Sequence, residues 1–170
     1  WKNKLNIAVA IIGAGVAGIT CAIEAAANGA EVVLVTPGVL SAGVGAGTGA
    51  GTGFESRIAA GLALAGGNTA LAQGGIAAAL GAGDRPELHA VDTVAAGVGL
   101  VDVAAARLLA SEGATAVSEL IALGFGVDRD ASGAVSFGLE AAHGKARIVH
   151  AGEDRTGAAL HAFLVAQLMN

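Results

Sequence analysis

The chain has 170 residues, a formal net charge of −5, and a composition that is 54% hydrophobic but only 3% aromatic. This length suits one domain or a part of a larger one, and the negative charge argues against a surface that binds nucleic acid. The single cysteine, Cys21, excludes an internal disulfide framework and a cysteine-ligated zinc site, so a reducing, cytoplasmic setting is expected.

A strand, a glycine-rich turn, a helix and a second strand are predicted at the start of the chain. Leu5–Ile12 is nearly all apolar and stops at Gly13, which is typical of a buried parallel strand. Gly15–Asn28 is rich in alanine and predicts a helix, with Gly29 placed to end it. Val32–Val35 predicts the next strand. In this order of elements a glycine-rich turn indicates a dinucleotide site.

The turn has the pattern G-x-G-x-x-G, formed by Gly13, Gly15 and Gly18. Gly13 permits the sharp exit from the strand, Gly15 lets the backbone approach a pyrophosphate, and Gly18 lets the helix pack closely on the strands. Val16 and Ala17 lie at the start of the helix, where backbone N–H groups and the helix dipole favour phosphate. The alternative interpretation is an ordinary βαβ unit with a glycine-rich turn.

The next part of the chain is low in sequence complexity. Gly38–Gly53 consists mostly of Gly, Ala, Val, Thr and Ser, and we expect a mobile loop there. Phe54–Ala65 predicts a short amphipathic helix. Gly66–Gly75 predicts a second loop, which leads into a small strand at Ile76–Leu80.

Helical patterns dominate the second half of the chain. Asp102 is a suitable N-cap for one helix, and Gly124 is a suitable terminator for another. Asp130–Gly133 separates two short apolar runs and predicts a hairpin. The predicted helices are Pro86–Gly99, Val103–Ser111, Ala114–Leu123 and Thr156–Met169.

Two long uncharged stretches raise the question of a membrane span. Leu5–Ile23 is interrupted by glycines at the positions that a nucleotide-binding turn needs. Ile58–Gly83 contains several glycines together with Asn68 and Gln73. Both stretches are too broken to predict a span, and none is expected. The sequence also lacks a P-loop and a serine-hydrolase elbow.

Four further sequence blocks carry a resemblance to a known family. With the glycine motif, they resemble in order and spacing the FAD-dependent superfamily of L-aspartate oxidases, succinate dehydrogenases and fumarate reductases, and the L-aspartate oxidases are the most similar. The resemblance implies an α/β fold: a single, partial, Rossmann-like FAD-binding domain over residues 1–170, with a parallel sheet and incomplete at its C-terminus. A Gly/Ala-rich stretch around residues 40–65 is expected to be an insertion. The blocks are Asn68–Leu80, Leu88–Gly97, Glu140–Gly152 and Asp154–Gly157.

The resemblance also implies roles for individual residues. Gly13–Gly18 would seat the FAD pyrophosphate, and Thr36 would lie near the adenosine ribose. Asn68 stands where the dehydrogenases and reductases carry the histidine that links covalently to FAD, so noncovalent FAD is implied. Glu140 would face a dicarboxylate substrate. The residues implied on the phosphate and isoalloxazine side of FAD are Asn68, Thr69, Gln73, Gly74 and Gly75.

The chain departs from the family pattern at several of these positions. Thr36 replaces the usual acidic residue at the end of the second strand, so only a hydroxyl is offered to the ribose. Leu139 replaces an arginine that the family places before Glu140. Ala141 and Ala142 replace a glycine pair, which puts the tight backbone geometry there in question.

The polar side chains after Glu140 leave alternatives open. Arg147 suits bidentate recognition of a carboxylate, and a surface role is an equal alternative. His143 and His150 are seven residues apart, but no third ligand with suitable spacing accompanies them, so packing or hydrogen bonding is favoured over a metal site. Glu140 is either the substrate-facing residue or a solvated carboxylate.

The function implied by the resemblance is FAD-dependent oxidation of L-aspartate to iminoaspartate, a step toward quinolinate and NAD. Members of the family are several times longer, so we expect this chain to be a fragment without a complete active site. One alternative is a flavoprotein of the succinate dehydrogenase or fumarate reductase type. Another is a non-catalytic dinucleotide-binding or structural domain. The sequence leaves the oligomeric state open.

Overall fold

A computed structural model describes residues 8–36, 40 and 67–170 of the chain. The chain divides into two compact units: unit 1 comprises residues 1–73 and 157–170, and unit 2 comprises residues 74–156. The predicted loop at Gly38–Gly53, apart from Leu40, and the predicted helix at Phe54–Ala65 lie outside the described residues, as does nearly all of the expected insertion around residues 40–65. Each unit is described by itself.

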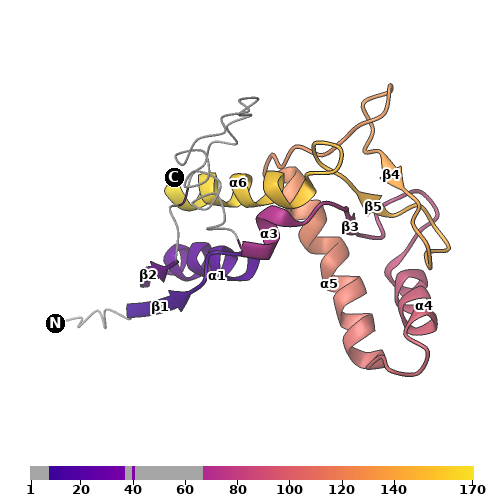
Figure 1. The fold of residues 1–170 in the computed structure, drawn as a ribbon, viewed down its shortest axis with the longest axis horizontal. Coiled ribbons are helices and arrows are strands. Elements are labelled where there is room, and N and C mark those ends of the chain that lie inside the picture. Colours follow the sequence, from indigo (N-terminus) through magenta and orange to yellow (C-terminus); the bar gives the residue numbers. More distant parts are fainter. Residues whose placement is uncertain (1–7, 37–39, 41–66) are drawn as a thin grey trace, which may run out of the picture. The chain divides into compact units, whose positions relative to one another are not determined.

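Unit 1 begins with the predicted strand–helix–strand motif (Figure 1). The strands β1 (Ala8–Ile12) and β2 (Glu31–Val35) pair in parallel, from Ala8 opposite Glu31 to Ile12 opposite Val35. The helix α1 (Val16–Ala27) connects them, as a crossover between parallel strands requires. This pairing confirms the α/β class, with the carboxyl ends of both strands at one edge of the sheet.

Two more helices belong to unit 1. The helix α3 (Gly67–Leu71) is a single short turn within the segment Gly66–Gly75, where the sequence predicted a loop. The helix α6 (Thr156–Met169) has the predicted bounds. The backbone N–H of Gly157, at the start of α6, donates to the carbonyl of Ala72 at 3.0 Å. Tertiary packing of this kind gives local order to a segment whose composition favours a loop.

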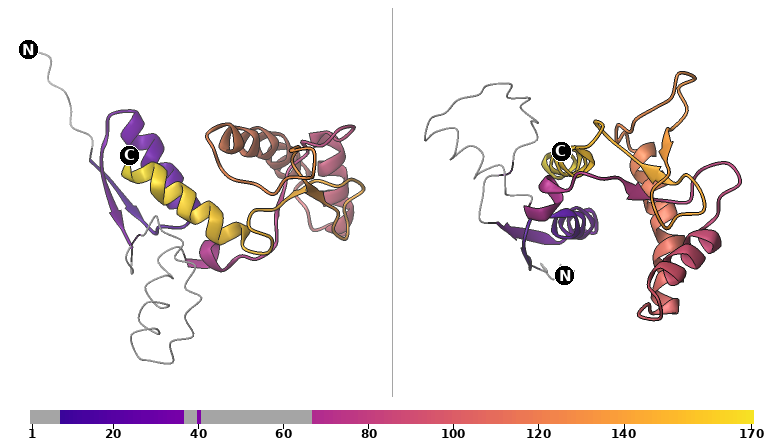
Figure 2. Two further views of the ribbon diagram at one scale, coloured as in Figure 1. Left: turned by 90° about the horizontal axis from the view of Figure 1, so that it is seen from above. Right: turned by 45° about the vertical axis from the view of Figure 1, so that its right-hand side comes forward.

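Unit 2 contains a small antiparallel sheet and two helices (Figures 1 and 2). The sheet has the order β3-β5-β4, with β3 at Ile76–Ala77, β4 at Phe137–Gly138 and β5 at Ile148–Val149. The helices α4 (Pro86–Ala96) and α5 (Val103–Ala122) pack against one another. Asp102 caps α5 as predicted, because its carboxylate accepts a hydrogen bond from the N–H of Ala105 at 3.0 Å.

The helix α5 corrects one prediction, since a single helix stands where the sequence indicated two. The predicted break after Ser111 falls at Gly113, which lies inside α5. A glycine inside a helix costs about 1 kcal/mol relative to alanine, and this is offset by a continuous buried stripe at helical spacing. The stripe consists of Ala106, Ala110, Ala114 and Val117. Neither α5 nor any other helix in the described part of the chain is long and apolar enough to cross a membrane.

The predicted hairpin is present, but its strands are shorter than expected. Arg129 and Val135 form an isolated antiparallel bridge, and the N–H of Asp130 donates to the carbonyl of Ala134 at 2.9 Å. The Asp130 carboxylate accepts from the N–H and the hydroxyl of Ser132, which holds the turn. After this turn the chain enters β4, whose partner is β5 rather than the predicted apolar run before the turn.

Candidate functional site

The glycine-rich turn of unit 1 has a geometry that other residues do not tolerate. Gly13 follows β1 at a φ of +105°, in the region that favours glycine, and its N–H donates to the carbonyl of Val35 at 2.8 Å. A Cβ on Gly18 would collide with the carbonyl of Gly13. The two glycines therefore permit the sharp exit from β1 and the close approach of α1 to the turn.

The start of α1 brings several of the predicted site residues together. Gly15 is the N-cap and offers no side-chain cap, and no acidic residue lies in the first turn. The N–H of Val16 donates to the hydroxyl of Thr69 at 3.3 Å, so α3 meets the N-terminal end of α1 (Figure 1). Thr36 directly follows β2, at the same edge of the sheet as Gly13. Ala17 is exposed on α1.

The helix α6 supplies a contact to the turn that the sequence did not predict. His161 is buried, and its Nε2 lies 2.9 Å from the carbonyl oxygen of Ala14. A Cβ on Gly157 would collide with the carbonyl of Thr69, so α6 also lies tightly against α3. No local sequence pattern indicates these pairs, because His161 and Ala14 are 147 residues apart.

The remaining predicted cofactor residues are divided between the units. Asn68 in α3 and Gln73 after it are exposed and belong to unit 1. Gly74 and Gly75 begin unit 2. A Cβ on Gly75 would lie 2.7 Å from the carbonyl of Val149, so packing against β5 already requires glycine at this position.

Glu140 belongs to unit 2, on the loop that joins β4 to β5. Its side chain is 55% exposed, and its carboxylate lies 3.9 Å from Nε2 of His150. Ala142 adopts a φ of +70°, and the N–H of His143 donates to the carbonyl of Glu140 at 3.2 Å. The loop therefore keeps a conformation typical of glycine although alanine occupies the position.

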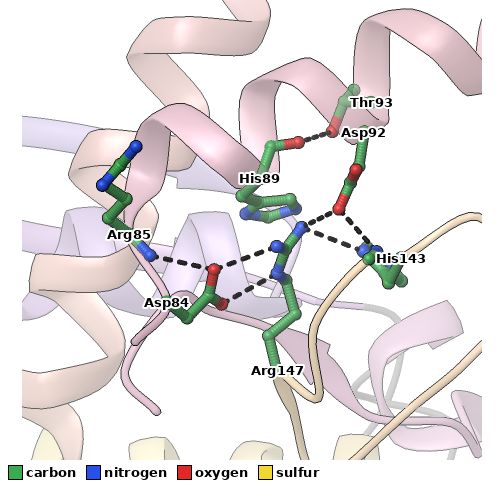
Figure 3. A network of polar contacts seen from close by, with 8 residues as sticks. Asp84, Arg85, His89, Asp92, Thr93, His143 and Arg147 are labelled. Atoms are coloured by element: carbon green, nitrogen blue, oxygen red, sulfur yellow. Dashed lines mark hydrogen bonds and ion pairs between the residues drawn. The ribbon is translucent and has the colours of Figure 1, made fainter. Parts of the chain in front are cut away.

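A buried arginine ties this loop to α4 (Figure 3). Arg147 is 0% exposed, and its guanidinium donates two hydrogen bonds to Asp84, at 2.9 and 3.0 Å. A third goes to Asp92 at 2.8 Å, and the same Asp92 oxygen accepts from the N–H of Gly144 at 2.7 Å. The carboxylate recognition predicted for Arg147 is thus directed at carboxylates of its own chain, and the surface alternative is wrong.

These contacts shift the ionisation of the cluster. Burial opposes ionisation of Asp84, but the hydrogen bonds from Arg147 and from the N–H of Arg85, together with the positive charge of Arg147, outweigh it and hold the pKa of that carboxyl below its usual value. The N–H of Gly144 lowers the pKa of Asp92, helped by Arg147. Burial would lower the pKa of Arg147, but Asp84 and Asp92 outweigh it and raise that pKa. The cluster is therefore an ionised, charge-assisted network.

Two histidines border the network without forming a metal site. Nδ1 of His143 lies 3.3 Å from a guanidinium nitrogen of Arg147, and the His89 ring lies beside the same group (Figure 3). Burial, and then the positive charge of Arg147, lower the pKa of His89, which favours its neutral form. Within the described ranges no group of three or more His, Cys, Asp or Glu side chains is arranged to hold a metal ion.

Comparison with known proteins identifies the family. A family model described as an FAD binding domain matches residues 40–170. The chain belongs to the FAD binding domain family. The matched range excludes the glycine-rich turn, so the turn supports the same cofactor independently. The FAD cofactor predicted from the sequence is thereby confirmed.

Curated relatives of this FAD binding domain are L-aspartate oxidases. That of Streptomyces coelicolor is 40% identical over 92% of this chain and 23% of its own length. That of Caulobacter vibrioides is 41% identical over 92% of this chain and 26% of its own length. The chain thus spans about a quarter of the length of these relatives, and the resemblance stated from the sequence is confirmed.

Solved structures with a similar FAD binding domain belong to the other branch of the superfamily. The Sdh1 complex of Mycobacterium smegmatis in the apo form is 30% identical and has a TM-score of 0.72, over 95% of this chain and 24% of that chain. An E. coli quinol fumarate reductase is 23% identical, with a TM-score of 0.69 over 96% and 25% of the two chains, and supports the fold alone.

The described residues fit the pyrophosphate of FAD. Gly15, the N-cap of α1, has no side chain to cap the helix, and no acidic residue lies in the first turn. The Thr69 hydroxyl accepts from the N–H of Val16, and a hydroxyl brings no negative charge, so this end of the helix suits an anion. At Gly18 a Cβ would displace the Gly13 carbonyl, and so the turn keeps its shape only with glycine there. These are the properties that the glycine motif requires of a dinucleotide site.

Proposed function

We propose that this chain forms the FAD-binding part of a flavoprotein that oxidises L-aspartate to iminoaspartate. The observation that carries the proposal is the glycine-rich turn at the N-terminal end of α1, in a chain 40% identical to an L-aspartate oxidase. FAD, when bound, supplies the two-electron acceptor for hydride from the substrate. The protein contributes binding, orientation and electrostatics. A cytoplasmic location accords with the single cysteine.

The cofactor residues act through backbone and hydroxyl groups. In this proposal the amides of Gly15 and Ala17 face the pyrophosphate, and Gly13 and Gly18 shape the turn that presents them. Val16 takes part through its N–H, which donates to the Thr69 hydroxyl and so places Thr69 beside the turn. Thr36 lies near the adenosine ribose. A second segment, which begins in α3, lines the phosphates and the isoalloxazine in this proposal. Its residues are Asn68, Thr69, Gln73, Gly74 and Gly75. Asn68 has no imidazole with which to form a bond to the flavin, so FAD is held noncovalently.

Glu140 is the residue that we assign to the substrate. Its carboxylate is more than half exposed, which leaves it accessible to a ligand. L-Aspartate differs from succinate in carrying an ammonium group, and a carboxylate attracts that group electrostatically. In this assignment Glu140 favours the amino acid over the plain dicarboxylate. Replacing it by glutamine is expected to weaken turnover of L-aspartate more than turnover of succinate.

A second candidate function is dicarboxylate chemistry of the succinate dehydrogenase type. It is favoured by the 30% identity to the Mycobacterium smegmatis Sdh1 complex over 95% of this chain. The two candidates share FAD and the fold, and differ in the substrate. The longer protein that contains this chain should oxidise L-aspartate in preference to succinate if the first candidate is correct. Preference for succinate would replace it by the second.

The cofactor part of the proposal is tested by titrating FAD into the chain and following flavin fluorescence. Gly18→Ala is expected to weaken binding at least about fivefold, because the added Cβ displaces the Gly13 carbonyl and overpacking of this kind costs about 1–3 kcal/mol. Gly113→Ala is the matched control. An added Cβ there meets nothing within 4 Å inside α5, so FAD affinity should not change. Equal affinities of the Gly18→Ala variant and the original chain would contradict the assignment.

A further inference from the structure

We propose that His161 is a positioning residue for FAD, which holds the glycine-rich turn through the carbonyl of Ala14. The inference rests on the proposed binding of the pyrophosphate at this turn, and goes beyond it by naming what keeps the turn in place. His161 lies on α6, in the part of unit 1 that is most distant in sequence from the turn. Nothing in the glycine motif itself indicates such a partner.

The chemistry of the contact fixes the proton on the imidazole. Nε2 of His161 lies 2.9 Å from the oxygen of Ala14, and a carbonyl oxygen only accepts hydrogen bonds. Nε2 therefore carries the proton and donates it. Both residues are buried, with Ala14 at 2% and His161 at 7% exposure. Because a buried polar group without a partner is unfavourable, each of the two groups depends on the other.

The position of Ala14 makes this contact relevant to phosphate binding. Ala14 lies between Gly13 and Gly15, in the irregular backbone that precedes α1. Drawing its carbonyl toward α6 fixes the peptide group that joins Ala14 to Gly15, and thus the direction of the Gly15 N–H. That N–H is one of the donors assigned to the pyrophosphate, so His161 acts on FAD through the backbone and without touching it.

A second chain of contacts holds the other side of the turn. Thr69 accepts from the N–H of Val16 at 3.3 Å. The segment that carries Thr69 is in turn held by α6, because the Gly157 N–H donates to Ala72 at 3.0 Å and a Cβ on Gly157 would strike the Thr69 carbonyl. The start of α6 therefore supports α3, and one turn later His161 supports Ala14. The helix thus supports the turn on both sides of Gly15, directly at Ala14 and through Thr69 at Val16.

The test compares three variants of the chain by FAD titration and by hydrogen exchange of the cofactor-free protein. His161→Phe keeps a ring of similar size but removes the N–H, and is expected to weaken FAD binding about five- to tenfold, in the range of a lost hydrogen bond. His161→Gln keeps an N–H donor at a similar reach, and should retain most of the affinity. Leu164→Ala, at a buried position one turn further along α6, should lower overall stability without changing FAD affinity.

Exchange in the cofactor-free chain makes the result independent of whether FAD binds tightly. His161→Phe should speed exchange of the amides at residues 14–18 more than exchange along β1 and β2, whereas Leu164→Ala should affect unit 1 evenly. If His161→Phe binds FAD like the original chain and leaves these amides unchanged, the proposal is wrong. If the original chain shows no FAD binding while the amide effect is present, the proposed FAD site is wrong and so is the role of His161 toward FAD, and only its hold on the turn stands.

Discussion

The two units of this chain hold their functional loops by opposite means. In unit 1 the turn at Gly13–Gly18 is shaped by hydrogen bonds to its backbone, with the Gly13 N–H on Val35 and the Ala14 carbonyl beside His161. It also leaves no room for a Cβ on Gly18. In unit 2 the loop that carries Glu140 is held by charged side chains, with Arg147 buried between two carboxylates.

The difference decides how each region responds to change. The backbone groups of the turn carry no net charge, so the turn of unit 1 depends on steric fit and on the hydrogen bonds that maintain its shape. A buried ion network depends on every member being present and ionised, because removing one partner leaves a buried charge without compensation. The comparison therefore predicts that the turn of unit 1 is sensitive to added atoms, whereas the loop that carries Glu140 is sensitive to lost charges and to acid.

The largest expected effect is that of removing Arg147. Arg147→Met keeps an unbranched side chain of similar length but leaves Asp84 buried without its partner. We expect unit 2 to lose about 3–5 kcal/mol of stability, as is usual when one partner of a buried pair is removed. The measurement is urea unfolding, combined with hydrogen exchange along α4 and β5 to locate the change.

Arg107→Met is the matched control for Arg147→Met. Arg107 is exposed on α5, and exposed charges contribute about 0–1 kcal/mol. A loss of less than about 1 kcal/mol for Arg147→Met would mean that the network contributes little and that the contrast between the units is wrong.

An intermediate effect is expected from acid, and it should be confined to unit 2. The pKa of His89 is lowered from its usual 6.5, so its contribution is fully present above that pH and is lost as the pH falls toward the lower, folded-state pKa. The pKa values of Asp84 and Asp92 are lowered from 3.8. Their contribution is present above about pH 4 and is lost as the pH falls through the folded-state values.

Unfolding measured between pH 8 and pH 3 should thus show two successive losses of stability, at the approximate pH values where these groups titrate. His89→Gln is expected to remove the first loss, and Asp92→Asn should reduce the second while lowering stability at neutral pH. Asp154→Asn, at an exposed position in unit 2, controls for the removal of one negative charge. If the free energy of unfolding stays constant from pH 8 to pH 3, the Arg147 network does not stabilise unit 2 in the expected way.

The same contrast explains what the sequence could predict. The turn of unit 1 was predictable because its glycines lie next to the strand and helix that they join, so the pattern is local. The partners of Arg147 were not, since Asp84 and Asp92 lie 63 and 55 residues away and nothing local pairs them. The contact of His161 was missed for the same reason. The single helix α5 was missed because tertiary burial along one stripe outweighs one glycine.

The smallest expected effect concerns backbone strain, where the units differ again. The positive φ before α1 is taken by Gly13, whereas in the Glu140 loop Ala142 adopts a φ of +70°. An L-residue in this region costs about 1–2 kcal/mol, and a glycine gives back about 0.4–1 kcal/mol through the greater entropy of the unfolded chain. Ala142→Gly should therefore stabilise unit 2 by about 0.5–1 kcal/mol, by the difference of these two effects.

Ala141→Gly is the matched control for Ala142→Gly, because Ala141 is the adjacent alanine and does not have a positive φ. Ala141→Gly relieves no backbone strain and should lower the free energy of unfolding by about 0.4–1 kcal/mol. Urea unfolding of the two variants should thus give changes of opposite sign. If both substitutions destabilise the chain equally, Ala142 is not strained, and the loop of Glu140 keeps its shape without the glycine that the turn of unit 1 requires. If the signs differ, Ala142 is strained, and the loop keeps this conformation beside the contacts that Asp92 makes with Gly144 and Arg147.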